Sequence, residues 1–355
     1  MSVVTIEELT PESLDVGAVA HYGDPHREQR SLGEGAGLVD RSHRGVIALT
    51  GEDRLTYLHN ITTQHLTGLP PWTGTETLFL SPHGHIEHHA LITDDGTTTW
   101  LDVEPGTVVD LHRFLDRMRF MMRVEPVDVS ADWAVLTLAG PQAAPVLAAL
   151  GVTLADPRVA AVPGPKFPSG TVAPHTTSGY AVSPLPTGGW ARSGVAGVDL
   201  LIPRSTVPDV WGRLIDAGAT PVGHWAYEAH RVAARRPRLG FETDHRTLPS
   251  EVDLMATAVH LDKGCYRGQE TVARVHNLGR PPRRLALLHL DGIATDHPPA
   301  PGTPVTLEDG REIGFVGTAT RHYELGMIAL AVLKRSTPDD AVLRVGESSA
   351  AIDLP

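Results

Sequence analysis

The chain has 355 residues, which is long enough for two or three domains with hydrophobic cores of their own. Its 42 acidic residues outnumber its 30 lysines and arginines, and the net charge of -12 argues against stable binding to nucleic acid. A single cysteine excludes a disulfide within the chain. Together with an acidic N-terminus that lacks the features of a signal peptide, it indicates a cytoplasmic protein. The longest apolar runs, such as 327–333, are too short to cross a bilayer, so no membrane partner is expected.

The first half of the chain predicts a compact αβ unit. Residues 45–50 form an apolar run typical of a buried strand, and residues 51–53 then open an amphipathic helix. Three strands joined by hairpin turns are predicted at 75–80, 85–93 and 98–103. The apolar residues of 107–122 follow a helical period, and the methionines among them are expected in the core.

A second module begins with a strand at 133–138 and an alanine-rich helix that ends at about Leu150. The proline- and glycine-rich segment 157–175 is expected to be a long loop. One strand and two helices follow, at 198–202, 207–217 and 223–235. Short strands with turn signals, typical of a small β-barrel or sandwich, are then predicted at 285–290, 303–307, 313–319, 327–332 and 341–345.

The segment DKGCYRGQETVAR, residues 262–274, contains the chain's only cysteine. In an extended backbone, side chains at i and i+2 point the same way, so Lys263 and Arg267 are expected to flank the Cys265 sulfur. A short helix predicted from Gln269 to Asn277 would place this sulfur just before a positive helix N-terminus. These features favour the thiolate over the thiol, and we predict a reactive, outward-facing sulfur.

The residues of this motif also have structural interpretations. A lone cysteine is most often a small buried hydrophobe, and Tyr266 is expected in the core rather than stacked on a ligand. Gln269 and Glu270 suit the first turn of a helix as well as the mouth of a binding site. Gly264 and Gly268 allow backbone angles that other residues avoid, which suits a loop that turns sharply to present the sulfur.

The motif resembles the K-G-C-Y-x-G-Q-E signature of the YgfZ family, folate-binding relatives of the glycine-cleavage T-protein. Weaker similarity extends over most of the chain, in GLVDRSHRGVIALTGEDRLTYLHNITT from Gly37, LTLAGPQAAPVL from Leu136, GATPVGHWAYEAHRVAARRPRLGFETD from Gly218 and TLPSE from Thr247. The resemblance implies an α+β fold with three domains in a ring around a folate-sized hole. Two intertwined αβ units, one centred on 52–130, would occupy residues 1–280, and a C-terminal β-barrel would occupy 281–355.

The resemblance also implies where folate chemistry would take place. The T-protein's aspartate for aminomethyl transfer lies in a G-G-x-x-D-D stretch, which here reads GHIEHH at 84–89, so that reaction is not expected. The family's pterin-binding carboxylate falls at Ala233, and a methyl group cannot replace it. The candidate replacements are Glu228 and Glu242. Arg231 and the arginines after it are candidates to bind the folate tail. Trp190, Trp225 and Tyr227 are candidates to stack on the pterin.

The YgfZ resemblance implies a role in assembling or repairing iron–sulfur clusters. It also implies downstream effects on the enzymes that use these clusters, including some that modify transfer RNA. Such clusters are usually held by four thiolates, and this chain has one. We therefore expect Cys265 to be one ligand of a transient or shared cluster, with a carrier or scaffold protein or a small thiol supplying the others. The expected cofactor is tetrahydrofolate or a related folate.

A metal-dependent enzyme is one alternative. Residues 83–89 are rich in histidine, and on a strand His85, Glu87 and His89 would share one face. Two histidines and a carboxylate are a known ligand set for zinc or iron(II). The alternative is that these are exposed or hydrogen-bonded histidines, because a chain with 19 histidines will contain some clusters by chance.

Two further enzyme functions are left open. Cys265 could be a catalytic nucleophile, which would need a histidine base such as His260 or His276 within hydrogen-bonding distance. The protein could also be a folate-dependent one-carbon transferase, the activity class of the T-protein that the motif resembles.

Overall fold

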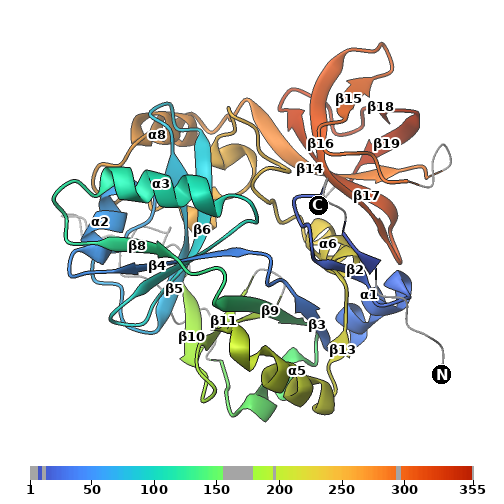
Figure 1. Cartoon of the computed structure of the whole chain (residues 1–355). Coiled ribbons are helices and arrows are strands. Elements are labelled where there is room, and N and C mark those ends of the chain that lie inside the picture. Colours follow the sequence, from blue (N-terminus) through green and yellow to red (C-terminus); the bar gives the residue numbers. More distant parts are fainter. Residues whose placement is uncertain (1–6, 10–12, 155–178, 195–196, 293–296, 354–355) are drawn as a thin grey trace, which may run out of the picture.

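The computed structural model describes residues 7–9, 13–154, 179–194, 197–292 and 297–353. Its strands form a two-stranded pair, an 11-stranded sheet and a closed six-stranded barrel. Figure 1 shows the barrel on one side of the molecule and the large sheet on the other, with a helix, α6 (His224–Ala233), between them. The expected α+β fold with a C-terminal barrel is confirmed.

The large sheet is built from two units that alternate along the chain. In spatial order its strands are β13 (Thr220–Pro221), β3 (Gly37–Asp40), β9 (Trp133–Ala139), β12 (Val198–Pro203), β11 (Trp190–Ser193), β10 (Tyr180–Pro184), β5 (Thr73–Leu80), β6 (Ile86–Asp94), β7 (Thr99–Val103), β4 (Gly45–Thr50) and β8 (Glu125–Asp128). The chain leaves the first unit after β3, builds the second from β4 to β8, and returns at β9. The two units are therefore intertwined in sequence.

Each unit has its own apolar core beneath short helices. In the second unit, α2 (Arg54–Ile61) and α3 (Val108–Met118) contribute Leu58, Leu111 and Leu115 to a core that also contains Phe79 and Ile92. The spacing of the α3 residues follows the helical period, because only one stripe of the helix meets the sheet. In the first unit, α4 (Ala143–Leu147) and α5 (Val207–Asp216) cover the corresponding core.

Helix α6 connects the sheet region with the barrel. It packs against α1 (Pro25–Glu34) and against the barrel strand β16 (Glu312–His322). A short antiparallel pair near the N-terminus, β1 (Glu7–Glu8) and β2 (Val19–His21), lies beside α6. This arrangement brings the N-terminal segment, α6 and the barrel together, although they are far apart in sequence.

The barrel closes because its first and last strands pair. Its order is β14 (Arg283–Leu290), β17 (Gly326–Lys334), β16, β15 (Pro304–Leu307), β18 (Leu343–Val345) and β19 (Ser348–Ile352), and β19 pairs with β14. Closure leaves no strand edge open for pairing with another chain. The shorter helices α7 (Met255–Ala258) and α8 (Gln269–Leu278) lie between the sheet and the barrel in sequence.

The predicted elements from 45–50 to 341–345 correspond to observed ones, with ends that shift by a few residues. The pattern missed the helices α1 and α7 and the strands β1, β2, β3, β8, β10, β11, β13 and β19, most of which are short. The predicted loop at 157–175 lies outside the described residues. No described helix combines the length and the apolar character needed to cross a membrane.

Candidate functional site

The loop before α8 holds Cys265 at the surface. The cysteine is exposed and is not in a disulfide. Helix α8 begins at Gln269 after Gly268, whose φ of +82° is left-handed. A Cβ at Gly268 would lie 2.6 Å from the Ser81 carbonyl oxygen, so glycine is needed here both for the turn and for the close approach. The predicted outward position of the sulfur is confirmed.

Lys263 does not flank the sulfur as the alternation of an extended strand predicts. Its side chain is buried, and Nζ donates hydrogen bonds to the backbone carbonyls of His59, Thr62 (2.6 Å) and Gln64 (3.0 Å). The backbone bends at Lys263 and Gly264, so the i, i+2 rule does not apply. Burial lowers the pKa of Lys263 to about 7. The lysine therefore anchors the loop from within.

The other motif residues also have structural contacts. Arg267 forms a half-exposed ion pair with Glu87 at 3.1 Å. Tyr266 is buried in the core, as expected, with the Lys263 Nζ 5.1 Å from its ring centroid. Gln269 donates from Nε2 to the Lys263 carbonyl at 3.4 Å, and Glu270 is exposed in the first turn of α8. Both cations expected at the sulfur thus have partners elsewhere.

A histidine base for Cys265 is not favoured by the position of His260. This residue is 2% exposed, and its Nδ1 accepts a hydrogen bond from the Asp262 backbone N–H at 3.2 Å. Its ring contacts that of His65, which in turn contacts His59. The other candidate, His276, lies in the last turn of α8. The catalytic pairing with Cys265 stays a prediction.

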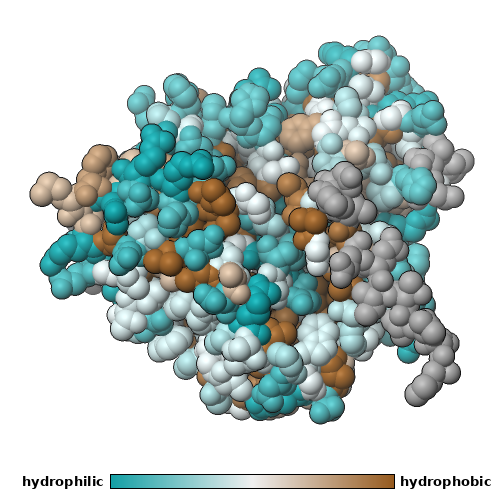
Figure 2. Space-filling view, viewed as in Figure 1, coloured by the Kyte–Doolittle hydropathy of each residue, from teal (hydrophilic) through white to brown (hydrophobic). Residues whose placement is uncertain are grey.

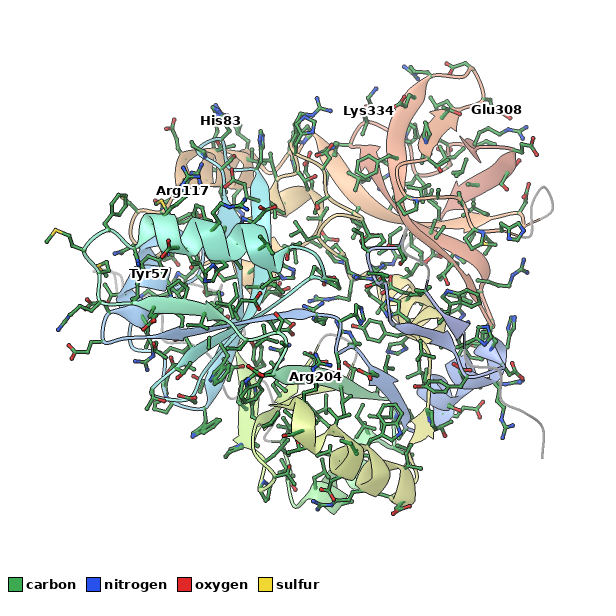
Figure 3. All side chains as sticks on the ribbon, in the orientation of Figure 1. Tyr57, His83, Arg117, Arg204, Glu308 and Lys334 are labelled. Carbon is green, nitrogen blue, oxygen red and sulfur yellow. The ribbon has the colours of Figure 1, made fainter. Side chains whose placement is uncertain are left out.

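The histidine-rich hairpin does not form the predicted metal site. His89 Nε2 lies 2.7 Å from Glu76 Oε1, Glu87 pairs with Arg267, and His83 points outward at the tip of the hairpin (Figure 3). The strand itself begins only at Ile86, so His85 precedes it. In the described part of the chain, the group whose ligand atoms come within 4.8 Å of one another is a different one, Asp15, His43 and His224.

Asp15 is the centre of a buried cluster that sequence reasoning missed. It accepts hydrogen bonds from Arg238 at 2.6 and 3.0 Å and pairs with His43 at 3.0 Å and His224 at 2.9 Å. Burial raises the pKa of Asp15, but the bonds from His224, His43 and Arg238 outweigh it and hold the pKa well below its usual range. The arginine already supplies the positive charge that a metal would bring.

The carboxylates expected to hold a pterin are bound to arginines. Arg231 donates to Glu228 at 2.7 and 3.0 Å and to Glu242 at 3.3 Å, and all three side chains are buried. Arg231 is therefore not available for a folate tail. Ala233 ends α6 and packs against barrel residues such as Leu287. The residues of this region do not fit a pterin in the expected pose.

The aromatic candidates divide into two groups. Trp190 is 2% exposed and packs against Trp100 and Trp133, while Tyr227 is buried beneath the Arg41 guanidinium, 4.4 Å from its ring centroid. Both belong to the core, so neither can stack on a ligand. Trp225, by contrast, is 42% exposed.

Two cavities differ strongly in size. The one lined by His89, Tyr227, Arg231 and Arg236 has a volume of about 30 Å³. The other, of about 530 Å³, lies between the N-terminal segment, α1, α6 and the barrel, and Trp225 and Glu228 line it. Sequence patterns gave no signal for the larger cavity, because its walls come from four separate parts of the chain.

The two-unit sheet with its closed barrel is the fold of a known aminomethyltransferase. The solved structure of the glycine cleavage system aminomethyltransferase T from Bartonella henselae matches with a TM-score of 0.80 and 17% identity, covering 99% of this chain and 94% of that one. Residues 21–263 match the GCVT N-terminal domain, and the chain belongs to that family.

Curated relatives agree with this assignment. A chloroplastic protein of Arabidopsis thaliana, named only as a transferase, is 26% identical over 95% of this chain and 74% of its own length. An aminomethyltransferase of Herpetosiphon aurantiacus is 28% identical over 86% of this chain and 81% of its own.

Proposed function

We propose that this protein is a YgfZ-type, folate-binding accessory protein that acts in the cytoplasm in the assembly or repair of iron–sulfur clusters. The observation that carries the proposal is the contrast within one loop. Cys265 is exposed, whereas Lys263 and Tyr266 on either side are buried and bonded. A sulfur held outward by an anchored loop suits contact with another molecule.

The thiol would act as one ligand of a cluster that a partner carries. Clusters usually need four thiolates, and this chain has one cysteine, so a carrier or scaffold protein or a small thiol must supply the others. The loop that holds Cys265 leads into α8, which begins four residues later at Gln269. The cluster is thus a cargo of the protein rather than a resident cofactor.

Folate binding is supported by relatives named aminomethyltransferase, an activity that the resemblance connects with tetrahydrofolate. The aminomethyl transfer itself is not supported by the local chemistry. His88 and His89 occupy the positions of the two aspartates, and His89 pairs with Glu76. We therefore infer a ligand-binding rather than a group-transferring role for the folate.

The test is anaerobic transfer of a cluster from a loaded carrier protein to an apo cluster enzyme, with wild type, Cys265→Ser and Arg267→Ala. Arg267→Ala is the matched control, because it changes the same loop and keeps the sulfur. Transfer should depend on Cys265 and survive in the control. Equal transfer by wild type and Cys265→Ser would contradict the proposed role.

A folate-dependent one-carbon transferase is the second candidate, favoured by the names of several relatives. It predicts turnover of an aminomethyl donor with tetrahydrofolate by the purified protein. Turnover that persists in Cys265→Ser would favour this candidate over the accessory role.

A further inference from the structure

A half-open cavity of about 530 Å³ lies between parts of the chain that are distant in sequence. Leu9 and Asp15 come from the N-terminal segment, Trp225 and Glu228 from α6, and Thr318 from the barrel strand β16. In Figure 1 this region lies where the N-terminal segment passes α6 below the barrel. A ligand here would touch the sheet side and the barrel side of the molecule together.

Volume decides between the two cavities. Ligand pockets for small molecules and cofactors generally measure about 300–1,000 Å³. The cavity beside Trp225 falls within this range, whereas the 30 Å³ cavity beside Arg236 has room only for a few water molecules. Arginine–carboxylate pairs fill the latter, and opening it would leave buried charges unpaired.

The walls of the larger cavity suit a flat aromatic ring. Trp225 is 42% exposed although it lies on a helix whose other residues are mostly buried, and the Phe241 ring lines the same space. Pro298, Pro299 and Pro301 add rigid apolar surface. An exposed aromatic ring beside a cavity, such as Trp225, offers a stacking surface that a core residue such as Trp190 cannot.

The floor of this cavity retains one site for a hydrogen bond. An ionised carboxylate has about four lone-pair sites. For Glu228, Arg231 donates to two at 2.7 and 3.0 Å, and Arg238 Nη1 forms an ion pair with Oε1 at 3.2 Å. Burial raises the pKa of Glu228, but Arg231 and Arg238 outweigh it and hold the pKa at about 2, so the group is charged at neutral pH. A ligand N–H can therefore still be accepted.

We propose that the cavity lined by Trp225, Phe241 and Glu228 is the folate site of this protein, with the pteridine ring against Trp225 and one of its N–H groups on Glu228. This inference rests on the folate binding of the proposed function. It places the ligand at the first turns of α6 rather than at Ala233, where that helix ends. The loss of the carboxylate at Ala233 is then no obstacle to binding.

The test is equilibrium binding of 5-formyltetrahydrofolate to the full chain by calorimetry. Trp225→Ala should weaken binding at least about tenfold, because stacking on an aromatic ring is lost, and Trp225→Phe should recover most of it. Arg236→Ala, which lines the small cavity, should leave affinity unchanged. Phe120→Ala is the matched control for loss of an exposed aromatic ring, since Phe120 is 81% exposed and does not line this cavity.

The outcomes separate the two proposals. Weaker binding by Trp225→Ala, with Arg236→Ala and Phe120→Ala unchanged, supports this site. Binding that Arg236→Ala weakens and Trp225→Ala does not would overturn the site and leave the proposed folate binding intact. Absence of binding by wild type would overturn the folate binding and the site together, while the cluster-transfer assay would still test Cys265.

Discussion

The Lys263 ammonium lies 2.6 Å from the carbonyl oxygen of Thr62, and this hydrogen bond ties the cysteine loop to the end of α2. The two residues are 201 positions apart in sequence. The contact explains how an exposed thiol can have a defined position. It also makes the motif lysine a structural anchor, a role that its place beside Cys265 does not suggest.

Replacing Lys263 with methionine should lower the free energy of unfolding by about 3 kcal/mol, because three buried carbonyls lose their donor. Urea denaturation measures the change. Arg267→Ala removes only a half-exposed ion pair and should cost less than about 1 kcal/mol. Equal losses for the two variants would show that Lys263 does not anchor the loop.

Asp15→Asn should destabilise the protein by about 2–3 kcal/mol, because the buried Arg238 guanidinium keeps Glu104 and Glu228 but loses its bonds to a charged carboxylate. Thermal unfolding of the variant measures this. The matched control is Asp110→Asn, since Asp110 pairs with Arg113 at the surface and its loss should cost little. A small effect at Asp15 would argue that the N-terminal segment does not depend on this cluster.

Acid should lower the free energy of unfolding of the protein through protonation of Glu76 and Glu228. Burial raises the pKa of both carboxyl groups, but their charged partners outweigh it. His89 and Arg236 hold the pKa of Glu76 at about 2, and Arg231 and Arg238 hold that of Glu228 at about 2. Both values lie below the 4.5 of the unfolded chain. Between pH 4.5 and 2 the unfolded chain binds more protons, so stability falls as the pH falls. Each group contributes about 3 kcal/mol at neutral pH.

Unfolding measured from pH 6 to pH 3 should therefore show a steeper loss for wild type than for Glu228→Gln. The variant has no proton to gain at this position. Parallel curves would contradict the assignment of Glu228 to this pH window.

His88→Phe should reduce the loss of stability between pH 6.5 and 4. The histidine packs against Phe79 and Phe114, and its Nδ1 is buried with no hydrogen-bond partner in the structure. Burial lowers its pKa to about 4, so the unfolded chain binds the extra proton in this range. Chemical denaturation at pH 5 and pH 8 tests this prediction. The free energy of unfolding of the variant, relative to wild type, should be higher at pH 5 than at pH 8.

One exposed apolar pair lies outside all of these sites. Phe120 and Met121, in the loop after α3, are 81% and 97% exposed, and Phe120 has a φ of +45°. Figure 2 shows tan, apolar atoms at the edge of the molecule where this loop lies in Figure 1. Nothing in the structure explains why these side chains remain uncovered.

Much of the fold followed from local pattern. The apolar run of 45–50 became β4 without change, and the period of 107–122 became α3, because burial on one face imposes the spacing directly on neighbouring residues. The pattern missed β10 and β11, although the two strands pair with each other and β11 pairs with the next strand, β12. The position of Cys265 at the surface was predicted from its glycines and flanking cations, although one of these cations, Lys263, points inward.

The sequence by itself therefore determined strands such as β4, helices such as α3 and α8, and the run of short strands at the C-terminal end, since each depends on residues within a few positions of one another. Only the tertiary structure decided that Lys263 points inward and that Glu228 and Glu242 pair with Arg231. It also decided that Asp15 reaches Arg238, 223 residues away. Ion pairs and cavities depend on which distant segments meet, and no local periodicity records that meeting.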